Sequence, residues 1–284
     1  MIISDSWQEY AVLEAAGGEK VERWGRFILR RPDPQVIWKA DKPLTKKVDG
    51  HYHRSREGGG HWEFFTKMPE RWTVSVDGLS FYVRPTGFKH TGLFPEQAAN
   101  WRYIRERSPE GSRVLNLFAY TGGATLAALS GGADVVHVDA SKGMVAWAKE
   151  NVELSGLSDR FVRFMVDDCE KFVQREIRRG SRYDGIIMDP PSYGRGPGGE
   201  MWKLENKIFD LVSMCTQILS DNPRYFIINS YTTGLAPTVM QNILKLTVEK
   251  KFGGSTEADE IGLPIRDSGL VLPCGSTARW ERTV

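Results

Sequence analysis

From about Lys89 onward, the chain alternates short apolar runs with segments whose apolar residues recur at helical spacing. This alternation restricts the possible folds more than any other feature of the sequence. The runs predicted as strands are Arg113–Phe118, Val135–Val138, Phe161–Val166, Tyr183–Met188, Tyr225–Asn229 and, in the tail, stretches around Gly269–Leu272 and Thr277–Glu281. The segments predicted as helices are Glu96–Arg107, Ala124–Ser130, Lys142–Leu154, Glu170–Arg179, Lys207–Leu219 and Pro237–Lys250. Strands that alternate with helices indicate an α/β fold with a doubly wound, mostly parallel sheet and right-handed crossovers.

The part of the chain before this pattern has a different character. It is rich in Trp, Arg, Gly and Pro, and it contains only short β-like runs. These runs are Arg26–Arg30, Gln35–Trp38, His61–Thr66, Trp72–Val76 and Leu79–Arg84. Asp77-Gly78, between the last two, predicts a hairpin turn. We therefore expect a small β-rich domain over residues 1–88 and an α/β domain over residues 89–284.

Composition sets limits on the class of protein. Charged residues are 26% and hydrophobic residues 40% of the 284 residues, as in ordinary globular proteins. The net charge is 38 − 36 = +2, so the chain as a whole is not a polycation. Cys169, Cys215 and Cys274 are far apart and odd in number, which argues against a disulfide framework and favours a reducing cytoplasm. No apolar run is long enough to span a membrane, and the first residues lack the pattern of a signal peptide.

Chemically informative residues follow the first three predicted strands of the α/β part. A Thr121-Gly122-Gly123 turn closes the first strand ahead of a helix, and glycines there let the backbone approach a ligand closely. Asp139 ends the second strand, where an acid can hold ribose hydroxyls or cap the next helix. Asp167 and Asp168 end the third, where a carboxylate can accept from an adenine amino group or again cap a helix. Because ligands of doubly wound sheets bind at these strand ends, their succession predicts a nucleotide-type site.

The fourth predicted strand ends in Asp189-Pro190-Pro191-Ser192-Tyr193, which suits the presentation of a flat, nitrogen-containing ring. Each proline fixes φ near about −65° and lacks a backbone donor. The proline carbonyls and the Asp189 carboxylate are therefore expected to accept hydrogen bonds. Tyr193 offers a face on which a base can stack. The alternative is a proline-rich turn that only closes a buried strand.

These motifs together resemble those of class I S-adenosylmethionine-dependent methyltransferases. More closely, they are similar to the bacterial large-subunit 23S rRNA methyltransferases that make 5-methylcytosine or 7-methylguanine. The matching pieces are His90–Gln97, Leu115–Gly123, Val138–Ser141, Asp167-Asp168 and Asp189–Tyr193. The resemblance implies a Rossmann-like class I methyltransferase domain with a C-terminal antiparallel strand, S-adenosylmethionine as the donor, and RNA as the partner.

The same resemblance implies roles for individual residues. The segment around Thr91, Phe94 and Gln97 would cover the donor, and Phe118 to Gly122 would line its methionine part. Asp139 would hold the ribose, and Asp167 or Asp168 the adenine. The residues implied to contact the donor also include Asn116, Ala119, Tyr120, Thr121, Ala140, Ser141 and Asp189. Those implied to face the methyl-accepting ring as catalytic residues are Asp189, Pro190 and Tyr193.

The chain departs from the family pattern of the 5-methylcytosine enzymes. Those enzymes attack the ring with a cysteine thiolate placed just after the Asp-Pro sequence or at the end of the next strand. Pro191 fills the first position here and Tyr231 the second, so cytosine C5 lacks its nucleophile. Cys274 lies in the tail, and nothing in the sequence brings it to the site. We therefore expect methylation at a ring or exocyclic nitrogen.

The β-rich part does not match the PUA or THUMP-type RNA-binding domains of many family members. It resembles instead the small linking domain found beside the catalytic one. The window from Arg23 to Arg56 holds ten Lys or Arg residues against three acids, with aromatic residues between them. Such a window suits a phosphate backbone with exposed bases, and equally a solvated rim around a β core. His51, His53 and His61 lie near one another, but a surface location explains them better than a metal site, so no metal is expected.

Three other functions remain open on the sequence alone. One keeps the donor but uses a small molecule or a protein as acceptor. Another is a nucleotide-binding oxidoreductase, which the absence of a G-x-G-x-x-G motif disfavours. The last is a silent RNA-binding scaffold, which the intact run from Asp189 to Tyr193 disfavours. The sequence does not fix the oligomeric state or the nucleotide that is modified.

Overall fold

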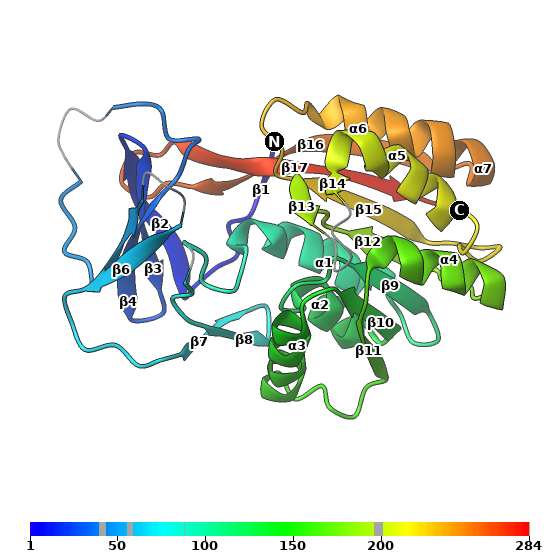
Figure 1. The fold of residues 1–284 in the computed structure, drawn as a ribbon, viewed down its shortest axis with the longest axis horizontal. Coiled ribbons are helices and arrows are strands. Elements are labelled where there is room, and N and C mark those ends of the chain that lie inside the picture. Colours follow the sequence, from blue (N-terminus) through cyan, green and yellow to red (C-terminus); the bar gives the residue numbers. More distant parts are fainter. Residues whose placement is uncertain (40–43, 56–58, 88, 196–200, 284) are drawn as a thin grey trace. The chain divides into compact units, whose positions relative to one another are not determined.

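The structure is a computed structural model that describes residues 1–39, 44–55, 59–87, 89–195 and 201–283 (Figure 1). The chain divides into two compact units. The N-terminal unit comprises Met1–Ala99 and Ile261–Cys274, and the sheet unit comprises Asn100–Glu260 and Gly275–Val284. The long strands β16 (Ser255–Pro264) and β17 (Val271–Glu281) have residues in both. The predicted division into a domain of residues 1–88 and a domain of residues 89–284 stays a prediction.

The sheet unit is built on strands in the order β16-β17-β15-β12-β9-β10-β11. The remaining bounds are β9 (Arg113–Leu117), β10 (Asp134–Asp139), β11 (Val162–Val166), β12 (Gly185–Met188) and β15 (Tyr225–Ser230). β9 pairs in parallel with both β10 and β12, β10 with β11, and β12 with β15, whereas β17 runs antiparallel to β15. The predicted α/β fold, with a mostly parallel sheet and a C-terminal antiparallel strand, is confirmed. Its order reverses between β9 and β12, which is the place where doubly wound sheets bind ligands.

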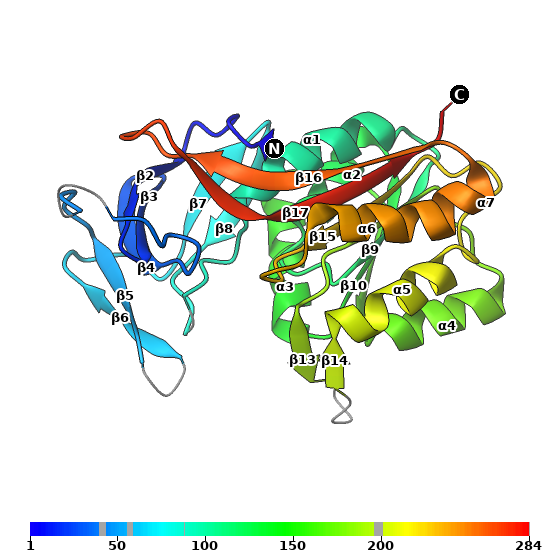
Figure 2. The same ribbon diagram turned by 90° about the horizontal axis from the view of Figure 1, so that it is seen from above.

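Helices cover the sheet, which explains why its central strands β12 and β15 are largely apolar. The helices are α1 (Ala98–Arg107), α2 (Gly123–Gly131), α3 (Lys142–Leu154), α4 (Cys169–Arg179), α5 (Leu204–Cys215), α6 (Pro237–Leu244) and α7 (Lys250–Phe252), with a π-helical turn at Lys245–Glu249. Helices α4, α5 and α6 lie on one side of the sheet (Figure 2). Their buried side chains share one core cluster with Leu115, Leu117 and Phe226. Every residue of β12 and β15 is buried, as expected for parallel strands covered on both faces.

The N-terminal unit contains a five-stranded sheet in the order β2-β3-β4-β5-β6. Its strands are β2 (Tyr10–Ala16), β3 (Glu19–Trp24), β4 (Phe27–Pro32), β5 (Gly50–Arg54) and β6 (Gly60–Phe64). β7 (Trp72–Val76) and β8 (Leu79–Val83) form a separate hairpin, and β1 (Ile2–Ile3) pairs with Ile261 and Gly262 of β16. The predicted hairpin turn is confirmed, since Asp77 and Gly78 both adopt positive φ between these strands.

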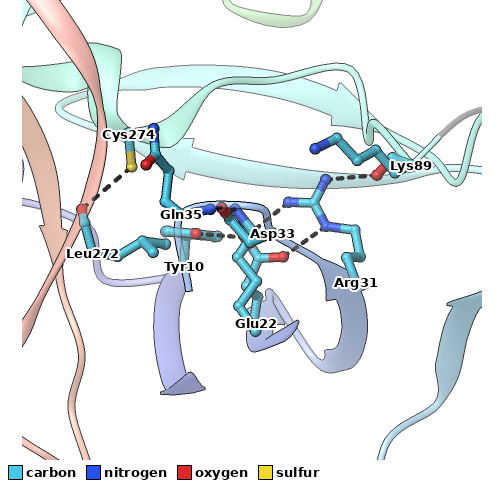
Figure 3. A network of polar contacts seen from close by, with 9 residues as sticks. Tyr10, Glu22, Arg31, Asp33, Gln35, Lys89, Leu272 and Cys274 are labelled. Carbon is cyan, nitrogen blue, oxygen red and sulfur yellow. Dashed lines mark hydrogen bonds and ion pairs between the residues drawn. The ribbon is translucent and has the colours of Figure 1, made fainter. Parts of the chain in front are cut away.

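A buried ion pair organises this unit (Figure 3). The Glu22 carboxylate accepts hydrogen bonds from Tyr10 Oη at 2.7 Å, Arg31 Nε at 2.7 Å and Arg31 Nη2 at 2.8 Å. Burial alone would raise the pKa of Glu22, but the charges of Arg31 and Lys20 outweigh it and lower the pKa to about 2. Arg31 Nη1 also donates to the Lys89 carbonyl at 2.7 Å. The pair therefore fastens β3 and β4 to the chain at Lys89.

Several predictions for the β-rich parts are wrong. Gln35–Trp38 is not a strand, and β2, β3, β5, β16 and the short hairpin β13 (Tyr193–Arg195) with β14 (Met201–Lys203) were not expected. The pairing of β2 with β3 shifts at a bulge between Val12 and Glu14, which breaks the alternation of apolar residues. In β3 the buried side chain of Glu22 occupies an inward position that reads as polar. The two predicted tail runs form parts of one strand, β17.

Candidate functional site

The carboxyl end of β9 leads into residues 118–122, which we call the β9–α2 loop. Phe118, Tyr120 and Gly122 all have positive φ, at 54°, 51° and 91°. This backbone region is uncommon for residues with a bulky side chain, so the surrounding structure must hold the loop in place. Strain of this kind is typical of loops that present their backbone to a ligand.

Three hydrogen bonds connect the β9–α2 loop to Asp139, Asn151 and Cys169. The Tyr120 N–H donates to Asp139 Oδ2 at 2.9 Å, and Asn151 Nδ2 donates to the Thr121 carbonyl at 2.9 Å. The Phe118 N–H donates to the Cys169 sulfur at 3.3 Å. The sequence did not point to Asn151 or Cys169, because nothing in the chain marks a helix residue that reaches back to a loop.

Gly122 and Gly123 lie close to the neighbouring helices. A Cβ on Gly122 would lie 3.1 Å from the Ala148 Cβ of α3, and one on Gly123 would lie 2.5 Å from the Trp101 ring of α1. The glycines therefore allow α2 to pack closely between α1 and α3. No side chain caps the N-terminus of α2, whereas Ser141 caps α3 and Asp168 caps α4. Its first-turn N–H groups and dipole thus suit an anionic group at the strand tips.

A buried polar chain lies beneath the loop. Asn116 Nδ2 donates to Thr125 Oγ1 at 3.0 Å, and Thr125 Oγ1 is 2.9 Å from His137 Nδ1. All three side chains are buried. Burial lowers the pKa of His137 to about 3, so the imidazole is neutral at pH 7. Asn116 therefore supports β9 and α2 from within the core. No motif in the sequence marked Thr125 or His137.

Asp139 lies at the tip of β10, next to the loop. Its Oδ2 accepts from the Tyr120 N–H, and its Oδ1 accepts from the Ser141 N–H at 2.8 Å. Burial raises the pKa of Asp139, and the two N–H groups act in the opposite direction. Ala140 and Ser141 are exposed just beyond it. The carboxylate is thus fixed in orientation at an open edge of the sheet.

Asp167 and Asp168 follow β11 and are already engaged. The Asp167 carboxylate is paired with Arg175, and the Asp167 N–H donates to the Asp139 carbonyl at 3.0 Å. Asp168 Oδ1 accepts from the Lys171 N–H at 2.9 Å as the N-cap of α4. Both residues lie beside Asp139, because β10 and β11 are neighbours. Each carboxylate has further lone pairs, so capping and ligand binding are compatible.

The Asp189–Tyr193 motif begins at the tip of β12, which neighbours β9. The Asp189 N–H points to the Leu117 carbonyl at 3.4 Å, and Pro190 is buried. The Pro191 carbonyl accepts a hydrogen bond from Trp202 Nε1 at 2.6 Å. The Tyr193 side chain is 54% exposed. The motif thus offers a polar acceptor group and an exposed ring at the switch point of the sheet.

Comparison with known proteins identifies this arrangement. Residues 33–203 match a family model described as S-adenosylmethionine-dependent methyltransferase. A crystal structure of the SAM dependent methyltransferase from Agrobacterium tumefaciens is 33% identical, with a TM-score of 0.92 over 100% of this chain and 94% of that chain. The chain belongs to the S-adenosylmethionine-dependent methyltransferases. The recognised family, the fold and the expected donor are thereby confirmed.

Two further comparisons set the range of the similarity. A putative SAM-dependent methyltransferase from Streptococcus mutans is 22% identical with a TM-score of 0.74, over 97% of this chain and 76% of that chain, and shows the fold alone. The Ribosomal RNA large subunit methyltransferase K/L of Shewanella sp. strain MR-4 is 33% identical over 74% of this chain and 32% of that protein. The chain therefore spans about a third of the length of the curated relatives it matches.

The residues of the sheet unit fit the donor of this family. The uncapped start of α2 suits a carboxylate, and the oriented Asp139 carboxylate suits a pair of hydroxyls. Thr91, Phe94 and Gln97 belong to the N-terminal unit and are described only within it. There, Thr91 is fully buried, its carbonyl accepts from the Arg84 N–H at 3.1 Å, and the Gln97 N–H donates to the Phe94 carbonyl at 3.1 Å. Their role toward the donor stays a prediction.

The methyltransferase carries no activated thiol in its sheet unit. Burial raises the pKa of the Cys169 and Cys215 thiols far above the ordinary range. In the N-terminal unit, burial likewise raises the pKa of Cys274, whose sulfur lies 3.5 Å from the Leu272 carbonyl. All three cysteines are free. None is arranged as a nucleophile.

The described residues were compared with the requirements of a metal site and of a membrane-spanning helix. No group of three or more His, Cys, Asp or Glu side chains among them is arranged to hold a metal ion. His51, His53 and His61 lie on β5 and β6. The His53 and His61 rings stack with centroids 5.3 Å apart, and the His51 and His53 rings are tilted at 47° with centroids 4.0 Å apart. Within the described ranges, no helix is long and apolar enough to cross a membrane.

Proposed function

We propose that this methyltransferase transfers a methyl group from S-adenosylmethionine to a ring or exocyclic nitrogen of a base in ribosomal RNA. The curated relatives named for large-subunit rRNA support an RNA acceptor. The proposal depends most on one observation. Asp189–Tyr193 lies at the tip of β12 beside β9, with the Tyr193 ring exposed. A flat base can stack on that ring while its edge meets Asp189 and Pro190.

In this proposal the donor occupies the tips of β9, β10 and β11. The β9–α2 loop, including Phe118, Ala119, Tyr120, Thr121 and Gly122, lines its methionine part, and the open start of α2 receives the carboxylate. Asp139 holds the ribose, with Ala140 and Ser141 beside it, and Asp167 or Asp168 meets the adenine. Asn116 acts from beneath through Thr125. Thr91, Phe94 and Gln97 are assigned to the cover of the donor on the family resemblance alone.

The bound donor supplies a methyl group on a positively charged sulfur. The protein then has to orient the acceptor and keep water away from the reacting atoms. An exocyclic amine loses a proton as its nitrogen–carbon bond forms. The Pro190 carbonyl accepts a hydrogen bond from the amine and orients it, and the Asp189 carboxylate takes up the proton that leaves. No described residue donates to the Pro190 carbonyl, whereas the Pro191 carbonyl is bonded to Trp202. A ring nitrogen with its own lone pair needs no base, and there Asp189 binds the edge of the ring while Tyr193 stacks on its face.

Nitrogen is favoured over cytosine C5 because the sheet unit offers no reactive sulfur. Methylation at C5 requires a thiolate that adds to the ring. Cys215 is in the core, and Cys169 lies under the β9–α2 loop with its sulfur accepting the Phe118 N–H. Tyr231 stands where the second family cysteine would lie, directly after β15. Neither family position for the nucleophile is therefore filled by a thiol.

The basic window from Arg23 to Arg56 contributes less free charge to RNA binding than its composition indicates. Arg30 pairs with Glu19, Arg31 with Glu22 and Lys46 with Asp267, all within the N-terminal unit. Lys42 and Arg56 lie outside the described residues. We assign the remaining basic residues of the window a supporting role in RNA contact, and we place the protein in the cytoplasm, where rRNA and free thiols are found together.

The decisive experiment measures methyl transfer directly. The purified protein is incubated with tritiated S-adenosylmethionine and with total RNA, naked 23S rRNA or large ribosomal subunits from a strain that lacks it. Nucleosides from the labelled RNA are then identified by mass spectrometry. We expect an N-methylated base from wild type and about a hundredth of that product or less from Asp189→Ala. Label in 5-methylcytidine would overturn the nitrogen assignment, and label only in protein or small molecules would overturn the RNA assignment.

A further inference from the structure

The hairpin formed by β13 and β14 directly follows the Asp189–Tyr193 motif and projects beside α5 (Figure 2). Its register pairs Tyr193 with Lys203 and Gly194 with Trp202. Because side chains alternate along a strand, Trp202 lies on the face opposite to Met201 and Lys203. Met201 is 57% exposed, whereas Trp202 is half-buried and packs against the core of the sheet unit. Among the described side chains of the hairpin, that of Trp202 is a large one that faces inward.

Trp202 contacts both halves of the site. Its Nε1 donates to the Pro191 carbonyl at 2.6 Å. Its ring lies 5.3 Å from the Phe118 ring, centroid to centroid, with the planes at 52°. Phe118 is the first residue of the β9–α2 loop and has the strained φ of 54°. One side chain therefore joins the acceptor motif at the tip of β12 to the loop at the tip of β9.

The two contacts have different physical consequences. The hydrogen bond fixes the direction of the Pro191 carbonyl, and since the neighbouring φ angles are set by the proline rings, it also fixes the Pro190 carbonyl. The ring contact with Phe118 holds the start of the β9–α2 loop in its strained form. Beyond the end of the β9–β12 pairing, the indole then sets the spacing between Pro191 and Phe118. In methyl transfer, a misplacement of about 1 Å between the reacting groups reduces the rate by about a hundredfold.

We propose that Trp202 is a positioning residue for methyl transfer, which holds the diproline carbonyls at a set distance from the donor-binding loop through its indole N–H and its ring. This role rests on the proposed function, because the rate measurement needs the RNA acceptor. In the proposed reaction, Trp202 contacts none of the reacting atoms. Packing in the core accounts for the Trp202 ring but not for its bond to Pro191.

Two substitutions separate the two contacts. Trp202→Phe keeps an aromatic ring against Phe118 and removes the N–H, so turnover should fall by about tenfold while S-adenosylhomocysteine affinity stays within about twofold. Trp202→Ala removes both contacts, so turnover should fall at least as far and S-adenosylhomocysteine affinity should fall about fivefold. Affinity is measured by calorimetry on the protein without RNA. Turnover is measured with saturating donor and rRNA, and thermal unfolding confirms that each variant is folded.

Trp280→Phe is the matched control. Trp280 Nε1 donates to the Gly253 carbonyl at 2.7 Å in the core of the same unit, away from the strand tips. This variant loses the same kind of bond and should lose stability, but its turnover per folded molecule should equal that of wild type. Wild-type turnover in Trp202→Phe, or an equal loss in Trp280→Phe, would overturn the positioning role of the N–H.

The affinity measurements do not depend on the identity of the RNA substrate, because they are made without RNA. If wild type methylates no RNA, the proposed function has failed, and the link to Phe118 is judged on binding alone. Trp202→Ala must then bind S-adenosylhomocysteine more weakly than both Trp202→Phe and Trp280→Phe. Equal affinities in all three variants would overturn that link.

Discussion

The donor side and the acceptor side of the sheet unit are built in different ways. On the donor side, Asp139 is held by two backbone N–H groups, and Asn116, Thr125 and His137 form a buried chain beneath the loop. On the acceptor side, the Tyr193 and Met201 side chains are both more than half exposed. A donor that never changes can be met by a rigid, preformed surface. A large acceptor has to arrive from outside, so its side of the site is left open.

The difference teaches where substitutions should act. A change at the tip of β10 should weaken donor binding, because the affected groups are fixed in place before the donor arrives. A change at the tip of β12 should lower turnover and leave donor binding intact. The four predictions that follow test whether the two sides are separable in this way.

The largest effect is expected for Asp189→Ala. Loss of the carboxylate removes the acceptor for the substrate N–H, so turnover should fall by about a hundredfold or more, while S-adenosylhomocysteine affinity stays within about threefold. Tritium transfer to rRNA measures the first quantity and calorimetry the second. Asp210→Ala, which removes an exposed carboxylate on α5, is the control and should match wild type. A proportional loss of donor binding in Asp189→Ala would show that the two sides are not separate.

Asp139→Asn should have the opposite effect to Asp189→Ala, with weaker donor binding and little change in turnover. The amide keeps the shape of the side chain, but only one of its two terminal atoms can accept, so the N–H of Tyr120 or Ser141 loses its partner. We expect S-adenosylhomocysteine to bind about thirtyfold more weakly, near 2 kcal/mol for a charged hydrogen bond. Turnover at saturating donor should change far less. Asp134→Asn, at the exposed start of the same strand, is the matched control, and equal weakening in both variants would refute the role of Asp139.

The buried chain under the loop should make the sheet unit sensitive to acid. The folded-state pKa of His137 is about 3, whereas the unfolded value is near about 6.5. Below about pH 6.5 the unfolded chain takes up a proton that the folded protein excludes, so stability present at neutral pH is lost as pH falls toward 3. The slope from this residue reaches about 1.4 kcal/mol per pH unit.

His137→Gln tests this origin of the acid sensitivity. Glutamine does not titrate, so the variant should be less stable at pH 7 but should lose stability less steeply between pH 6 and about pH 4. Urea unfolding at several pH values measures the slope. His61→Gln, which replaces an exposed histidine of the N-terminal unit, serves as the control. If the free energy of unfolding of His137→Gln depended on pH as steeply as that of wild type, His137 would not be the origin of the acid sensitivity, and the buried polar chain would be accessible to water.

The two units also differ in how far their elements could be predicted. β9, β10, β12 and β15 are covered on both faces, so their sequences are nearly continuous apolar runs that stand out from the helices. In the N-terminal unit, the bulge in β2 and the buried Glu22 on β3 disturb the alternation on which strand prediction depends. Glu22 is tolerated there because Arg31 and Tyr10 lie opposite it, and such a partner cannot be read from local sequence.

For the site, the sequence indicated the strand tips but not the side-chain directions. Asp139 and Asp189 follow their strands, so their position at the switch point was predictable from the strand order. Asn116 lies within β9 and faces inward to Thr125, which the motif could not show. Trp202 reaches the site only because a hairpin turns the chain back on itself, and that hairpin has no strong signal in the sequence.

The smallest effect is expected for the cysteines. Cys215→Ala, Cys274→Ala and Cys169→Ser should each keep turnover within about threefold of wild type, because methylation at nitrogen needs no thiolate. Serine at residue 169 retains an oxygen that can accept the Phe118 N–H, so the loop keeps its support. The measurement is tritium transfer to rRNA, with calorimetry as a check on donor binding. Suppose that one of these variants binds the donor normally but loses both turnover and a covalent adduct that wild type forms with RNA. The methyl acceptor would then be a ring carbon, and that cysteine would be its nucleophile.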